Sequence, residues 1–170
     1  MRRLAIAALA LLAACAALEQ SGRPVTRPAG DEGMVVYVVG RLSFEAPSGW
    51  TATGDDRRVR IASPQGQVRI EADAVDRPVA NEAQCLADAE TVLARSAATV
   101  VNVRRHPTSF AGRRALTQEG DQGGWHSWAW AVCDGMTQYR LWFTGLSPMG
   151  PEALEAHRIL VASVQLGAAP

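Results

Sequence analysis

The sequence RRVRIASPQGQVRIEADAV, residues 57–75, decides the fold of this chain. Hydrophobic and charged residues alternate in both halves of this stretch, as they do in strands that bury one face. Pro64, Gln65 and Gly66 lie between the halves and are typical turn residues. The stretch therefore predicts a β-hairpin with one apolar face.

The charged face of the hairpin is rich in arginine. Such a cluster could bind anionic headgroups or an acidic partner, because arginine grips phosphate and carboxylate with two parallel hydrogen bonds. Neighbouring carboxylates favour the simpler interpretation, a solvated strand face with balanced charge. The arginines are Arg57, Arg58, Arg60 and Arg69, and the carboxylates are Asp55, Asp56, Glu71 and Asp73.

Further strands and two helices are expected around the hairpin. Apolar residues at helical spacing predict a helix over residues 82–97 that Asn81 would cap, and Pro151 suits the first position of a second helix. These elements predict one α+β domain over residues 34–170, in which two main helices cover a largely antiparallel sheet. The expected strands span residues 34–39, 41–46, 50–53, 57–62, 67–75, 99–105, 113–118, 125–133 and 138–144.

The composition limits what this protein can do. The 170 residues are 48% hydrophobic and 20% charged, which is enough for one buried core. All 17 basic residues are arginine, so mechanisms that need a Schiff-base, P-loop or protein-kinase lysine are excluded. The formal net charge of +0 argues against a nucleic-acid partner, since such binders are usually basic.

Residues 1–14, MRRLAIAALALLAA, have the layout of a secretory signal peptide. The apolar run is shorter than the roughly 20 residues that a membrane-spanning helix needs. The following Leu12-Ala13-Ala14-Cys15 resembles the lipobox of bacterial lipoproteins. This resemblance implies cleavage before Cys15 and attachment of lipid, including a fatty acyl chain such as palmitate, to that residue. An ordinary signal peptide with a chance cysteine is the alternative.

A lipid on Cys15 would place the protein on the periplasmic face of a bacterial membrane, with the membrane as its first partner. Ala16 follows the cysteine, whereas enterobacterial lipoproteins kept in the inner membrane carry Asp there, so the outer membrane is favoured. Residues 15–33 contain Pro24 and Pro28 and no apolar period. They are expected to form a flexible, lipidated tether.

Cys85 and Cys133 are the remaining cysteines. In an oxidising periplasm two such cysteines are expected to form a disulfide. A metal site with a histidine as third ligand is the alternative, but neither cysteine lies in a CxxC or CxH spacing. The histidines show no ligand spacing either, so we expect no metal and no cofactor.

Two short motifs show a resemblance to a known family. Phe44-Glu45-Ala46-Pro47-Ser48-Gly49-Trp50 resembles the F-x-x-P-x-G-W opening of PsbP-like and DcrB-like domains, and Phe110-Ala111-Gly112-Arg113-Arg114-Ala115 is similar to their F-x-G-x-x-A step. The resemblance covers roughly residues 38–166. It implies an α/β/α sandwich, often in a lipid-anchored exported protein that acts as a binding or assembly factor. It supplies no catalytic residue, and its pattern does not include the cysteine pair.

The tryptophan-rich stretch is the candidate partner-binding region. In a strand, Trp128 and Trp130 share one face with His126, while small residues on the opposite face suit a covering helix. Surface tryptophan is useful mainly in recognition, so at least one of Trp128, Trp130 and Trp142 is expected to be substantially solvent-accessible, and Trp50 buried. If all were shielded, the cluster would simply be core. The candidate binding residues are Trp128, Trp130, Trp142, His126 and Arg140.

Three functions are considered. A non-enzymatic binding or assembly module of the cell envelope comes first, and a flat exposed aromatic patch would favour it. A carrier of a small apolar ligand comes second, and a tryptophan-lined pocket would favour it. No catalytic motif such as GxSxG occurs, but a hydrolase using His126 or His106 would be favoured by a histidine hydrogen-bonded to a carboxylate at a cleft.

Overall fold

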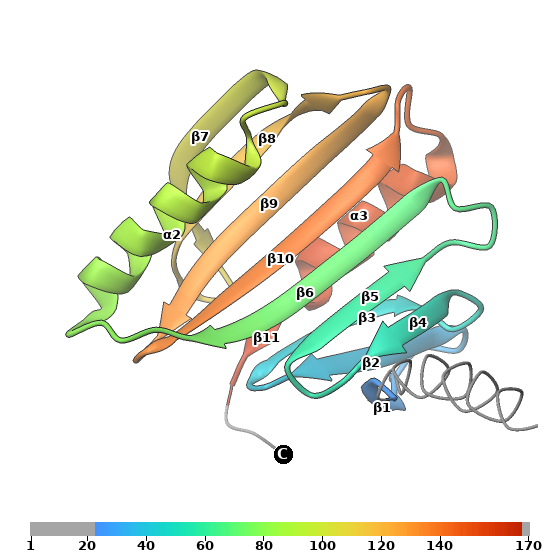
Figure 1. Ribbon diagram of the computed structural model, residues 1–170. Helices are drawn as coiled ribbons and strands as arrows, with labels where there is room; N and C mark the ends of the chain where they lie inside the picture. The colour runs from blue at the N-terminus through green and yellow to red at the C-terminus, as the bar shows by residue number, and fades with distance from the viewer. Residues whose placement is uncertain (1–22, 168–170) are drawn as a thin grey trace, which may run out of the picture.

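The computed structural model describes residues 23–167, and it contains two antiparallel sheets and two helices (Figure 1). The expected signal peptide and Cys15 lie outside the described residues. Within residues 23–167, no helix is both long and apolar enough to cross a membrane.

The larger sheet has seven strands in the order β4-β5-β6-β10-β9-β8-β7, and all neighbouring strands are antiparallel. The predicted hairpin is confirmed as β5 and β6, and its register pairs Arg58 with Asp73 and Ala62 with Arg69. The strands are β4 (Thr51–Gly54), β5 (Arg58–Ala62), β6 (Val68–Asp76), β7 (Val101–Phe110), β8 (Arg113–Gln122), β9 (Trp125–Asp134) and β10 (Thr137–Leu146).

The smaller sheet corrects part of the expected tether. Its order is β1-β2-β3-β11, with β1 (Val25–Pro28), β2 (Met34–Val39), β3 (Leu42–Pro47) and β11 (Gln165–Leu166). Strand β1 lies within residues 15–33 and pairs with β2, so this part of the segment is not a flexible tether. The proline at its end is tolerated because β1 is an edge strand, where a missing N–H need not break a ladder.

Both predicted helices are confirmed, as α2 (Glu82–Ser96) and α3 (Pro151–Ser163). The side chain of Asn81 caps α2 by accepting a hydrogen bond from the backbone N–H of Gln84 at 2.9 Å. Figure 1 shows α2 in front of the seven-stranded sheet and α3 behind it. The α+β class and the α/β/α sandwich are therefore confirmed, whereas the division of the strands into two sheets was not predicted.

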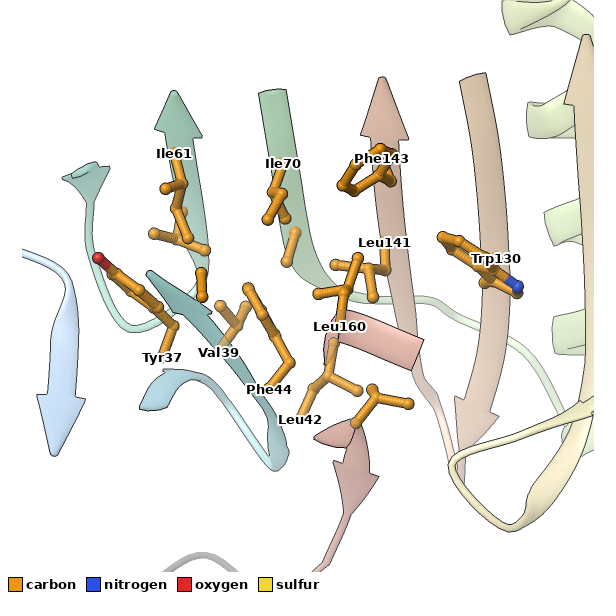
Figure 2. Close-up of a cluster of buried hydrophobic side chains, with 14 of the residues drawn as sticks. Tyr37, Val39, Leu42, Phe44, Ile61, Ile70, Trp130, Leu141, Phe143 and Leu160 are labelled. Atoms are coloured by element: carbon orange, nitrogen blue, oxygen red, sulfur yellow. The ribbon is translucent and has the colours of Figure 1, made fainter. Parts of the chain in front are cut away.

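The main core lies between the seven-stranded sheet, the smaller sheet and α3 (Figure 2). Burial of one large apolar side chain contributes about 1.5–3 kcal/mol, so this core supplies much of the driving force for folding. Trp50 is 7% exposed and belongs to this core, as predicted. The largest fully buried side chains of this core are Phe44, Phe143, Leu42, Ile61, Ile70, Leu141 and Leu160.

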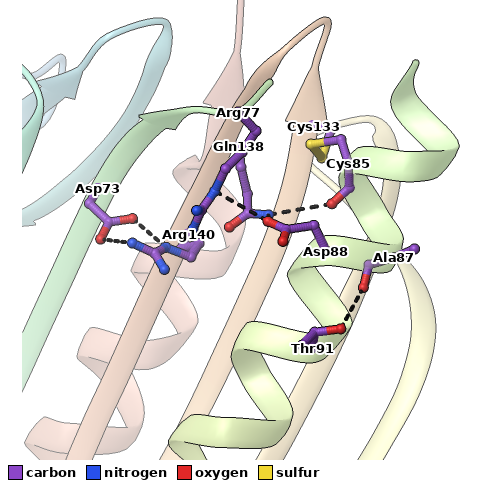
Figure 3. A network of polar contacts seen from close by, with 9 residues as sticks. All are labelled: Asp73, Arg77, Cys85, Ala87, Asp88, Thr91, Cys133, Gln138 and Arg140. Carbon is purple, nitrogen blue, oxygen red and sulfur yellow. Dashed lines mark hydrogen bonds and ion pairs between the residues drawn. A yellow bond between two sulfur atoms is a disulfide. The ribbon is translucent and has the colours of Figure 1, made fainter. Parts of the chain in front are cut away.

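A second, thinner layer lies under α2. Ala89 and Leu93 of the helix pack on Ala129 and Ala131 of β9, the small residues that were expected to lie beneath a helix. The predicted disulfide joins Cys85 of α2 to Cys133 at the end of β9 (Figure 3). Helix α2 is thus held to the sheet both by apolar contact and by a covalent bond.

Candidate functional site

The five candidate binding residues do not lie on one face of the sheet. The β9–β10 turn is two residues long, because Asp134 pairs with Thr137, and this register sets Trp142 opposite Ala129. Trp142 and Arg140 therefore lie on the α2 side, while His126, Trp128 and Trp130 lie on the α3 side. The expectation of a single binding face is corrected.

The tryptophans also form no flat exposed patch. Trp130 is 6% exposed and stacks on Phe110, with 5.1 Å between ring centroids. Trp128 and Trp142 are half-buried, so they are less shielded than Trp50 but not substantially exposed. The expectation that at least one of these three tryptophans is substantially solvent-accessible is therefore wrong, since Trp128 and Trp142 are only partly exposed.

The space beside Trp128 and Trp130 is filled by other rings. His157 of α3 lies 4.2 Å from Trp128 and 5.7 Å from Trp130, measured between ring centroids. Phe143 packs against both Trp128 and His157. These rings occupy the place that the carrier alternative assigned to an apolar ligand.

His126 forms the histidine–carboxylate contact that the hydrolase alternative requires. Its Nδ1 lies 2.6 Å from Oδ1 of Asp121, and Oδ2 of Asp121 accepts a hydrogen bond from Asn102. These bonds from Asn102 and His126 lower the pKa of the Asp121 carboxyl. The pair borders a cleft of about 430 Å³ that Arg104 and Glu119 also line.

This cleft lacks a recognisable nucleophile. Among residues 23–167, no hydroxyl or thiol group shares a hydrogen bond with His126. His106, the other candidate base, lies exposed on β7. Nor does the described part of the chain gather three histidine, cysteine or carboxylate side chains that could hold a metal ion.

The opposite side of the sheet carries a different surface. Helix α2 packs on β8, β9 and β10, and within residues 23–167 no element lies in front of β5 and β6 (Figure 1). A groove of about 410 Å³ runs between α2 and these strands. We call it the arginine groove. Its floor consists of Arg58, Arg69, Glu71, Asp73, Arg140, Trp142 and Thr144, and Val92 and Ser96 of α2 form its wall.

Asp73 and Arg140 form the fixed part of the floor. Nε and Nη2 of Arg140 donate to the two carboxylate oxygens of Asp73 at 2.7 and 2.5 Å (Figure 3). The side chains of Asp73 and Arg140 are 6% and 12% exposed. Arg140 also lies over Trp142, 5.3 Å from the ring centroid. A charge pair this buried is held in one geometry and serves the structure of the floor.

The hairpin arginines are held much more loosely. Nη2 of Arg58 lies 3.4 Å from Asp73, and Nε of Arg60 lies 3.4 Å from Glu71, with arginine side chains 55% and 60% exposed. Arg57 pairs with Asp76. The predicted charge balance thus holds for Arg58 and Arg60, whereas Arg57 pairs with a carboxylate that was not predicted. Asp55 does not take part, because its carboxylate accepts the backbone N–H groups of Arg57 and Arg58.

Arg69 departs from that balance. Among residues 23–167, no carboxylate lies within ion-pair distance of Arg69, and its guanidinium carbon lies 4.7 Å from the centroid of the Trp125 ring. Its neighbours across the two flanking strands are Ala62 and Thr144. The sequence analysis named Arg69 only as one of four equivalent hairpin arginines, and it did not predict the groove. Counting the hairpin register outward from the turn would have placed Arg69 opposite an alanine.

Comparison with known proteins adds to the fold but not to the site. No family model and no curated protein matches this sequence. Among solved structures, the chain is similar to cyanobacterial PsbP from Synechocystis, with 11% sequence identity and a TM-score of 0.56 over 83% of this chain and 96% of that one. A protein from Bacteroides thetaiotaomicron matches with 12% identity and a TM-score of 0.44 over 75% of this chain and 45% of that chain. The first similarity confirms the PsbP-like fold.

Proposed function

We propose that this protein is a non-enzymatic, lipid-anchored module on the periplasmic face of a bacterial membrane, with the outer membrane favoured. It binds a protein of the cell envelope through the arginine groove and acts as a binding or assembly factor. The lipobox-like sequence ending at Cys15 supports the anchor. The PsbP-like fold is consistent with the role that the sequence resemblance implies.

The proposed binding role rests mainly on one observation. On the α2 side of the seven-stranded sheet, strands β5 and β6 are not covered by any element of residues 23–167. The other face of the same sheet packs against α3 and the smaller sheet. The arginine groove instead presents loosely held guanidinium groups and the half-buried ring of Trp142, and Trp125 lies beside it against Arg69. Arginine and tryptophan are the side chains most enriched where proteins recognise proteins.

Site-specific photo-crosslinking in living cells tests this role. A photoreactive amino acid at Thr144, on the groove floor, is expected to give a discrete adduct with one envelope protein, identified by mass spectrometry. The matched control places it at Val161, which is exposed on α3. Equal adducts from both positions, or adducts with lipid alone, would contradict binding at the groove.

The anchor has its own test. The Cys15→Ala variant is expected to lose fatty-acid labelling and signal processing, because the thiol that would carry diacylglycerol is absent. Unchanged labelling of this variant would remove the lipid anchor from the proposal.

Hydrolysis is the second candidate, favoured by the 2.6 Å contact between His126 and Asp121 at a cleft. In that case His126 would take a proton from an attacking water, and Asp121 would orient the imidazole. A panel of ester substrates tests it with wild type and His126→Gln. Turnover that disappears in His126→Gln would establish the hydrolase and overturn the non-enzymatic role.

A further inference from the structure

Three rows of side chains cross the open part of the sheet beside α2. The β5–β6–β10 register places Arg58, Asp73 and Arg140 in the first row, Arg60, Glu71 and Trp142 in the second, and Ala62, Arg69 and Thr144 in the third. Consecutive rows are two residues apart along each strand. Because a strand rises about 3.3 Å per residue, the rows are about 6.6 Å apart.

Each row offers one guanidinium group to a ligand. Arg69 has no carboxylate partner among residues 23–167, and Arg58 and Arg60 are exposed and held only by contacts of 3.4 Å. Exposed ion pairs contribute little to stability and are easily replaced by a ligand carboxylate. Arg140 is not available in this way, because Asp73 already occupies its hydrogen-bonding edge.

The charge of this surface favours an anionic ligand. Four arginines, Arg58, Arg60, Arg69 and Arg140, face two carboxylates, Glu71 and Asp73, which leaves an excess of two positive charges on the three rows. Guanidinium groups bind carboxylates through two parallel hydrogen bonds, which fixes the position as well as the sign of the ligand charge.

The shape of the groove favours a chain over a flat surface. Helix α2 forms one wall through Val92 and Ser96, and a helix with its side chains is about 10–12 Å across. A bilayer surface would therefore contact the helix before it reached the floor. An extended polypeptide can lie in the groove along the strand direction, and its side chains on one face then repeat every two residues, about 6.6 Å apart.

We propose that the partner segment is an extended acidic stretch with carboxylates at alternate positions, which meet Arg58 and Arg69 in the groove and Arg60 in the row between them. Arg69 is its main anchor, because binding there breaks no ion pair within the described part of the chain, residues 23–167. This inference rests on the proposed binding function and adds the chemistry of the partner.

Peptide titration of the full mature lipoprotein in non-ionic detergent tests the inference. The probe is an eight-residue peptide of alternating glutamate and serine, and the control peptide has four glutamates followed by four serines. The alternating peptide is expected to bind several-fold more tightly. Arg69→Gln is expected to lower the affinity for the alternating peptide by about tenfold or more, as expected for loss of a hydrogen bond between charged groups. The matched control is Arg158→Gln, an exposed arginine paired with Glu155 on α3, which should leave binding unchanged.

Three results would overturn the inference: equal affinity for both peptides, binding that does not depend on Arg69, or no binding of either peptide. Glycerol phosphate, a soluble mimic of a lipid headgroup, provides the remaining arm. If it displaced the peptide at similar concentrations and in an Arg69-dependent way, the groove would bind headgroups instead. The two proposals can fail separately. If Thr144 gives a protein adduct but the alternating peptide does not bind, the binding function is supported and only the proposed acidic partner is wrong.

Discussion

The guanidinium group of Arg69 reaches from β6 across β10 and lies over the ring of Trp125 on β9, 4.7 Å from its centroid. This contact holds a cation that has no carboxylate partner among residues 23–167 at a defined place on the groove floor. Cation–π contacts of this kind contribute about 0.5–1 kcal/mol at exposed sites. Arg69 is therefore positioned in advance for a ligand.

Trp125→Leu is expected to weaken binding of the alternating acidic peptide by about two- to fivefold, which is the change in affinity that corresponds to loss of such a contact. The charge of the groove stays the same in this variant, so the loss reports positioning alone. Trp125→Phe keeps an aromatic face and should lose less. Unchanged affinity in Trp125→Leu would show that the ring does not hold Arg69 for binding.

Asp73→Asn is expected to destabilise the protein by about 3–5 kcal/mol, because it leaves the buried guanidinium of Arg140 without its counter-charge. Glu71→Gln is the matched control on the same strand, since its pair with Arg60 is exposed, and it should change stability by less than about 1 kcal/mol. Urea unfolding measures both. Similar losses in the two variants would contradict the structural role of the Asp73–Arg140 pair.

Removal of the disulfide is expected to lower the free energy of unfolding by about 4 kcal/mol, because Cys85 and Cys133 are 48 positions apart and close a long loop. The variant with both cysteines changed to serine should match wild type unfolded in reducing buffer. Two free thiols in unreduced protein isolated from the periplasm, or no loss of stability, would contradict this prediction.

The stability of the protein should fall as the pH drops below about 6.5, through His157. Burial lowers the pKa of this histidine below its ordinary value of 6.5, and the nearby His126 lowers it further. The unfolded chain therefore takes up the proton first, and stability is lost as the pH falls through 6.5 toward the folded pKa. His157→Gln should reduce this pH dependence in denaturant titrations, whereas His106→Gln, on the exposed β7, should not. An unchanged pH dependence in His157→Gln would contradict the assignment.

Local signals predicted the elements of this fold well. Asn81 marked the start of α2, Pro151 the start of α3, and the turn at residues 64–66 the central hairpin, because caps and turns depend on a few neighbouring residues. Strand β1 was missed because all four of its residues are exposed and show no alternation. It forms a strand only because its backbone pairs with the free edge of β2. The division into two sheets likewise depends on long-range pairing that local alternation does not carry.

The site was predicted less well, because it depends on register. Alternation correctly placed Trp128 and Trp130 on one face of β9, but only pairing with β10 shows that Trp142 lies on the other. The hairpin arginines looked equivalent in sequence. Pairing across strands gives Arg58 and Arg60 a carboxylate each and leaves Arg69 opposite Ala62.

The most direct test of the binding function is photo-crosslinking from Thr144 in cells that produce either the Arg69→Gln or the Arg158→Gln variant. Arg69→Gln is expected to reduce the yield of the envelope-protein adduct by about tenfold. Arg158→Gln, on α3, is expected to leave the yield at the wild-type level. An adduct of equal yield in both variants would contradict recognition by the arginine groove.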